Sequence, residues 1–119
     1  MNHCSWLDCF ASEWVCYLEQ HGHRVTYLAE WPGTLASVKG RGRRYRWLLK
    51  CVEGDSILLT PSCRKDIRTQ DRLARRARQE CFVVVKFGQP GGSAIVIPAG
   101  EAVRARRLDS TKGAIPWDC

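Results

Sequence analysis

The sequence predicts a small α/β domain in which a mixed β-sheet is flanked by two helices. Three observations favour this class. The chain has 119 residues, which is the size of one domain. Its composition is that of a globular protein, with 45% hydrophobic and 26% charged residues. Stretches with helical periodicity alternate with short apolar runs typical of strands. We therefore expect one domain over residues 1–119, with an irregular tail from about residue 109.

A first helix is expected over residues 3–21. Its apolar side chains recur every three or four residues, as on the buried face of a helix: Leu7, Phe10, Trp14, Tyr17 and Leu18. Gly22 is the expected C-terminal cap, because glycine readily adopts the left-handed conformation found there. The two histidines that flank it, His21 and His23, are expected to lie in a solvent-exposed turn.

Apolar runs then predict strands, with turns of glycine, proline and charged residues between them. The expected strands cover residues 24–29, 34–38, 45–52, 82–87 and 94–97, with a short apolar stretch at 57–59 and an edge strand at 103–108. The run from Tyr45 to Val52 is the strongest, so we place it at the centre of the sheet. The glycine-spaced basic turn at 39–43 lacks the Gly-Lys-Ser/Thr of a phosphate-binding loop.

A second helix is expected over residues 64–79, with Ser62 as its N-cap. Its apolar stripe is thin, and its cations are many: Arg64, Lys65, Arg68, Arg72, Arg75, Arg76 and Arg78. Such a charge run is either a solvated face or a surface that binds phosphates or an acidic partner.

The net charge of +7 comes mostly from arginine, which supplies 14 of the 19 basic residues. Guanidinium groups match phosphates and stack on bases, so this balance favours a nucleic-acid partner over a purely solubilising role. No apolar run is long enough to cross a membrane, and the first residues lack a secretory signal. We therefore expect an intracellular chain without a membrane partner.

The seven cysteines predict no metal site, because none falls in the Cys-x-x-Cys spacing of zinc ligands. Cys51 and Cys81 lie inside apolar strands and are expected to be small buried side chains. The pairing of the cysteines is left open.

The order of elements and the basic surface resemble the restriction-endonuclease-like fold, and two of its branches fit. Archaeal Holliday-junction resolvases carry an acid on the first helix, an Asp on the second strand and Glu-x-Lys on the third. Glu13 and Lys50 match two of these positions, but the Asp position falls on Thr34 or Leu35 and the Glu position on Leu48. Neutral side chains cannot hold the Mg²⁺ of such a site, so this branch implies a catalytically degraded, nucleic-acid-binding protein.

The second branch is the C-terminal domain of archaeal tRNA-intron endonucleases, which resembles residues 11–98 through three short motifs. These are Leu18-Glu-Gln-His-Gly-His-Arg-Val25, Trp31-Pro-Gly-Thr-Leu35 and Arg72-Leu-Ala-Arg-Arg-Ala-Arg-Gln79. The family cleaves RNA without metal, using a Tyr, a His and a Lys. Those three positions fall on Trp31, Arg44 (or its neighbour Arg43) and Gln79, none of which supplies the same chemistry at neutral pH.

The resemblance implies a short, non-catalytic structural subunit of a heteromeric tRNA-splicing endonuclease, and this is the interpretation we favour. It implies two copies each of this chain and a catalytic subunit, a precursor tRNA as the RNA partner, and no cofactor. The degraded resolvase remains the alternative, and a stand-alone RNA-binding domain is a third interpretation.

This interpretation places RNA contacts on Arg43, Arg72, Arg75 and Arg76. It places the subunit interface near the C-terminus, because that family pairs subunits through its last strands and tails. The residues expected there are Ile95, Ile97, Ile115 and Trp117.

Overall fold

The computed structural model describes residues 4–28, 33–54, 56–88, 94–105 and 107–109. The helices are α1 (Cys4–Gln20), α2 (Pro61–Arg76) and α3 (Ala99–Ala105). The strands are β1 (His23–Tyr27), β2 (Thr34–Lys39), β3 (Arg43–Val52), β4 (Ser56–Leu58), β5 (Glu80–Phe87), β6 (Ala94–Pro98) and β7 (Arg107–Asp109). None of the helices in the described part of the chain is long and apolar enough to cross a membrane.

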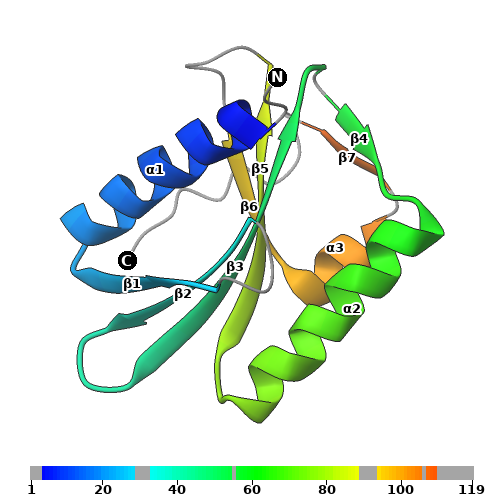
Figure 1. Cartoon of the computed structure of the whole chain (residues 1–119). Helices are drawn as coiled ribbons and strands as arrows, with labels where there is room; N and C mark the ends of the chain where they lie inside the picture. The colour runs from blue at the N-terminus through cyan, green and yellow to red at the C-terminus, as the bar shows by residue number, and fades with distance from the viewer. Residues whose placement is uncertain (1–3, 29–32, 55, 89–93, 106, 110–119) are drawn as a thin grey trace.

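A five-stranded mixed sheet in the order β1-β2-β3-β5-β6 forms the centre of the molecule (Figure 1). The pairs β1–β2, β2–β3 and β5–β6 are antiparallel. β3 and β5 are parallel, because α2 forms the crossover between them. The expected mixed sheet with β3 at its centre is confirmed.

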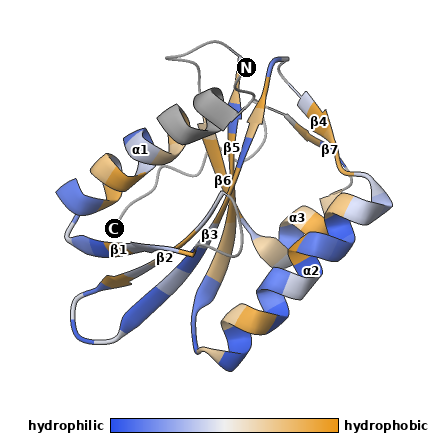
Figure 2. Cartoon of the chain, in the orientation of Figure 1, coloured by the Kyte–Doolittle hydropathy of each residue, from blue (hydrophilic) through white to orange (hydrophobic). Residues whose placement is uncertain are grey.

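The two faces of the sheet are covered by different helices (Figure 1). α1 packs on one face, over an aromatic core that contains Trp14 and Trp47. α2 and α3 pack on the other face, over an aliphatic core of β5, β6 and helix residues such as Ile67. Successive side chains of the central strands point to opposite faces and enter both cores. β5 is therefore apolar at almost every position (Figure 2).

α1 confirms the expected first helix, and Gly22 follows it with a φ of 89°. His23 is a correction. It begins β1 rather than lying in an exposed turn, and its side chain is only 3% exposed. The hydroxyl of Ser37, on the neighbouring strand, lies 3.0 Å from its Nδ1 and provides the polar contact that burial requires.

The second helix begins earlier than expected, and its N-cap is Thr60 rather than Ser62. The Thr60 hydroxyl accepts a hydrogen bond from the backbone N–H of Cys63 at 3.1 Å. Pro61 then occupies the first helical turn, where its missing N–H costs nothing. The helix ends at Arg76, followed by Arg78 in the left-handed region at a φ of 59°.

The expected edge strand at 103–108 is wrong over residues 103–105, which belong to a helix. Residues 99–105 form α3, which buries Ala102 and Val103 against the core. Only residues 107–109 are extended, and they pair with β4 in a separate two-stranded sheet rather than with the main sheet. Pro98 ends β6 and lies just before the first helical position, which favours the start of a helix.

Candidate nucleic-acid interface

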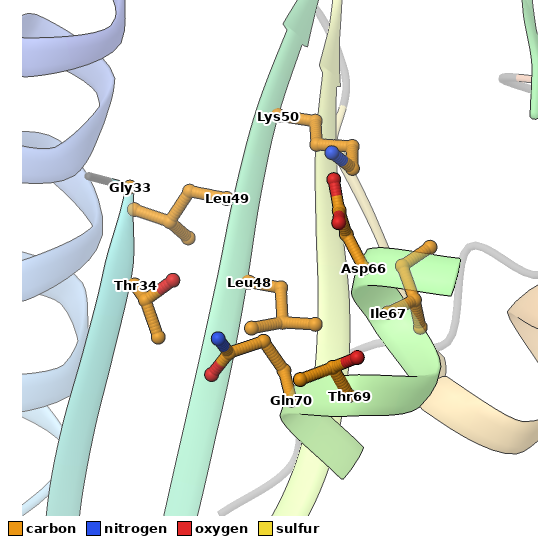
Figure 3. Close-up of a pocket in the computed structure, with 9 residues that line it drawn as sticks. All are labelled: Gly33, Thr34, Leu48, Leu49, Lys50, Asp66, Ile67, Thr69 and Gln70. Atoms are coloured by element: carbon orange, nitrogen blue, oxygen red, sulfur yellow. The ribbon is translucent and has the colours of Figure 1, made fainter. Parts of the chain in front are cut away.

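A pocket of about 240 Å³ lies between β2, β3 and α2, on the face of the sheet opposite α1 (Figure 3). Its lining combines charged, polar and aliphatic groups: Gly33, Thr34, Leu48, Leu49, Lys50, Asp66, Ile67, Thr69 and Gln70. No family motif pointed to Asp66 or Gln70, because the second helix was interpreted by its cations alone.

Strand alternation explains which residues reach this face. Arg46 contacts α2, so Leu48 and Lys50, at two-residue steps along β3, face the same way. Thr34 is paired with Leu48 across β2 and β3, which brings its side chain to the same face. Leu35, one residue on, is 1% exposed in the aromatic core under α1.

Lys50 and Asp66 supply the two charged groups of the pocket. Lys50 is near the end of β3 and Asp66 is in the second turn of α2, and their charged ends point toward one another (Figure 3). Among the described residues, neither group makes a hydrogen bond or a salt bridge within 4.0 Å. Both are therefore available to a ligand.

A buried arginine lies next to the pocket, hydrogen-bonded to the lining residue Gln70. Arg46 is 9% exposed, and its guanidinium donates to the side-chain oxygen of Gln70 at 2.6 Å and of Gln79 at 2.9 Å. Both partners are neutral amides. Because Gln70 accepts through Oε1, its Nε2 group is left as a donor at the pocket wall.

Beyond the pocket, the same face of the sheet is open and basic. Val38 on β2 is paired with Arg24 on β1 and with Arg44 on β3, so the three side chains form one row across the strands. Both arginines are exposed. We call Arg24 and Arg44 the basic row; it lies on the same face of the sheet as Lys50, which is six residues further along β3 than Arg44.

α2 carries the other expected cations. Arg72, Arg75 and Arg76, the residues expected in RNA contacts, are exposed on it. Arg75 is paired with Asp71 at 3.2 Å, one helical turn away. Arg43 is exposed at the start of β3, one residue from Arg44 and therefore on the opposite side of the strand.

The metal-site positions implied by the resolvase resemblance do not come together as a cation site. Glu13 lies on α1, across the sheet from Lys50, and pairs with the buried Lys86 at 3.8 Å. Thr34 rather than Leu35 reaches the pocket, and Leu48 forms its aliphatic wall. In the described part of the chain, no three His, Cys, Asp or Glu side chains are grouped to hold a metal ion.

The three positions implied by the splicing-endonuclease resemblance form no catalytic group in the described residues. Arg44 belongs to the basic row, and Gln79 holds the buried Arg46. Trp31 lies outside the described residues.

Of the four residues expected at the subunit interface, two are buried in the core and two lie outside the described residues. Ile95 and Ile97 are 0% and 9% exposed and belong to the aliphatic core under α2 and α3, so their side chains are not presented at the surface. Ile115 and Trp117 lie outside the described residues.

The buried thiol at position 81 behaves as expected for a small core side chain. Cys81 is 8% exposed in the aliphatic core, and burial raises the pKa of its thiol to about 12. Burial also raises the pKa of the Cys51 thiol, which is half-buried under α1.

Comparison with known proteins identifies the fold. No family model and no curated protein matches the chain. Among solved structures, the chain is similar to Hjc, a Holliday junction resolvase from the archaeal hyperthermophile Archaeoglobus fulgidus. The two share 18% sequence identity at a TM-score of 0.63, over 90% of this chain and 93% of the resolvase.

This finding overturns the favoured interpretation of the sequence. The assignment to the tRNA-splicing endonucleases was wrong, and with it the role of a structural subunit in splicing. The motifs that suggested it are short and cover helix ends and strand starts, which any fold with this order of elements repeats. The chain has a restriction-endonuclease-like fold, and the structure it resembles is that of a Holliday junction resolvase.

Proposed function

We propose that this protein binds branched DNA through the open face of the sheet and does not cut it. The observation that carries the proposal is the basic row, Arg24 and Arg44, which lies on the same face of the sheet as the pocket that Lys50 lines. Phosphates bind such surfaces through electrostatic attraction and the release of counterions. The resolvase with the same fold acts on Holliday junctions, which makes branched DNA the polymer to test first.

The absence of cutting follows from two neutral side chains. Leu48 and Thr34 line the pocket where a resolvase-like metal site would need carboxylates. An aliphatic side chain and a hydroxyl do not supply the negative charge that binds and activates Mg²⁺. A DNA partner would also place the chain inside the cell.

Fluorescence anisotropy tests the proposal with three labelled nucleic acids: a four-way DNA junction, a linear duplex of the same length and an RNA hairpin. We expect the junction to bind most tightly, with affinity falling as salt rises. No strand should be cut in Mg²⁺ or Mn²⁺. Equal affinity for all three would contradict selective binding, and cutting that Lys50→Ala abolishes would contradict the non-cutting role.

A matched pair of variants locates the surface. Arg24→Gln with Arg44→Gln removes the basic row and should lower the slope of log affinity against log salt by about 2, one for each lost phosphate contact. Arg104→Gln with Arg107→Gln removes the same charge from α3 and β7, and should leave the slope nearly unchanged. Equal effects of the two pairs would show that only net charge matters.

A further inference from the structure

The pocket beside the basic row is neither a phosphate site nor a metal site by its charges. Lys50 attracts a phosphate, but the Asp66 carboxylate at the same mouth repels it. Asp66 attracts a metal ion, but it is the one carboxylate in the lining, and Lys50 faces it. A ligand that satisfies both groups must carry donors and an acceptor next to one another and no net charge.

The remaining lining extends this pattern. Leu48 and Ile67 are aliphatic, buried, and suited to the faces of a flat ring. The Nε2 group of Gln70 is a donor, since Arg46 occupies its oxygen at 2.6 Å. The hydroxyl of Thr69 donates to the backbone oxygen of Lys65 at 3.0 Å, so its lone pairs are left as acceptors. The volume of about 240 Å³ is below that of pockets for drug-sized molecules.

We propose that this pocket receives a single guanine base that has left the DNA stack. Guanine carries two neighbouring N–H donors on its Watson–Crick edge, which match the two oxygens of Asp66. The adjacent O6 is an acceptor, which matches Lys50. Adenine, cytosine and thymine each present at most one donor group to a carboxylate at that edge. Enzymes that receive extruded bases read them through this same edge.

The site deepens the proposed function and rests on it. Branch points and bulges contain bases that are unstacked at low cost, and a protein can bind such a base while holding the flanking phosphates. Arg44 of the basic row lies on β3, and Arg72 and Arg76 lie on α2; both of these elements line the pocket. A guanine at a branch point therefore satisfies the pocket and the basic surface together.

The test uses the whole protein and duplexes with one unpaired nucleotide: guanine, adenine, cytosine, thymine or an abasic site. In fluorescence anisotropy, we expect the unpaired guanine to bind about 10-fold tighter than the others, the discrimination typical of one bidentate base contact. Asp66→Asn should remove this preference without weakening binding to the other duplexes. Glu19→Gln removes the same charge from an exposed position of α1, across the sheet from the pocket, and should keep the preference.

A second measurement does not depend on any variant. A fluorescent guanine analogue that keeps the Watson–Crick edge, placed at the unpaired position, should brighten when the protein binds, because it leaves its stacked neighbours. Equal affinity for all five duplexes, or no brightening, would overturn the guanine site while the DNA-binding function stands. No binding to any duplex or junction would overturn the function itself. Guanosine monophosphate, titrated as a competitor, distinguishes a base in DNA from a free nucleotide. If it binds as tightly as the duplex with the unpaired guanine, and Asp66→Asn abolishes its binding, the site belongs to a free nucleotide and the extruded-base proposal is overturned.

Discussion

On one side of the sheet, α1 closes an aromatic core, whereas on the other α2 leaves a polar pocket next to an open basic surface. On the aromatic side, the rings pack against one another: the ring centroid of Trp47 lies 5.2 Å from that of Phe82 and 5.6 Å from that of Trp14. The pocket side places Lys50 and Asp66 where nothing in the described chain pairs with them. One strand, β3, contributes side chains to both faces of the sheet.

The difference teaches how one strand separates stability from function. Tyr45, Trp47 and Leu49 point toward α1 and are buried, and the alternate residues Arg44, Leu48 and Lys50 face the basic surface and the pocket. Substitutions at neighbouring positions should therefore have opposite consequences. The predictions below test this separation.

The largest effect is expected at the centre of the aromatic core. Trp47 is 0% exposed, and its indole N–H donates to the Ser37 hydroxyl at 2.8 Å. Trp47→Ala should lower the free energy of unfolding by about 3–5 kcal/mol, through lost burial and the cavity left behind. Urea denaturation followed by circular dichroism measures it. A loss below 1 kcal/mol would show that α1 does not depend on this core.

His23, which lies next to Trp47 in the aromatic core, should make the stability of the protein depend on pH. Burial, with the charges of Lys39 and His21, lowers the pKa of His23 from 6.5 to about 4. The unfolded chain therefore binds a proton between these values that the folded chain does not. Stability should be full above pH 6.5 and fall by up to about 3 kcal/mol as the pH drops to 4.

Urea denaturation across this pH range measures the His23 contribution. His23→Gln removes the titrating group, so the slope of stability against pH should become shallower by the amount assigned to His23. Carboxylates titrate at the lower end in both proteins and cancel in the difference. Identical slopes would show that His23 does not carry the effect.

On the pocket side, the buried Arg46 should matter moderately for stability. Arg46→Ala leaves the side-chain oxygens of Gln70 and Gln79 without their donor, at a cost of about 2 kcal/mol. Arg44→Ala, on the same face of the same strand but exposed, should cost less than about 0.5 kcal/mol. Thermal denaturation of the two variants compares them directly. Equal losses of stability would contradict a stabilising role for the hydrogen bonds that Arg46 makes to Gln70 and Gln79.

The smallest effect on stability is expected at the pocket rim. Lys50→Met should change the free energy of unfolding by less than about 0.5 kcal/mol, since the ammonium group has no partner in the described chain. The same change should weaken DNA binding measurably in anisotropy. A large stability loss with unchanged binding would reverse the comparison between the two faces.

The sequence predicted the elements whose patterns are local. α1 follows from its three- to four-residue spacing, β3 from its long and largely apolar run, and β5 from its continuous apolarity. Residues 103–105 were misassigned because Val103 and its neighbours are compatible with either a strand or a short helix. Only packing of Ala102 and Val103 against the core decides between the two.

The candidate site was predicted less well, because its contacts join distant parts of the chain. His23 is buried through Ser37, 14 residues away, and Arg46 is held by Gln70 and Gln79, 24 and 33 residues away. Lys50 was correctly placed near the end of its strand, but nothing local to Asp66 shows that it faces Lys50. The splicing interpretation failed because its motifs were short enough to occur in a different protein with a similar order of elements.

The parallel pairing of β3 with β5 also has a consequence for the order in which the chain folds. β1, β2 and β3 are joined through antiparallel neighbours, whereas β5 reaches β3 only after the crossover through α2 has closed. Contacts of such sequence separation form slowly, because loop closure comes before the contact is gained. The pocket needs β3 and α2 together, so it is assembled at this late step. A substitution that weakens β5 would therefore delay formation of the site, although none of the lining residues lies in that strand.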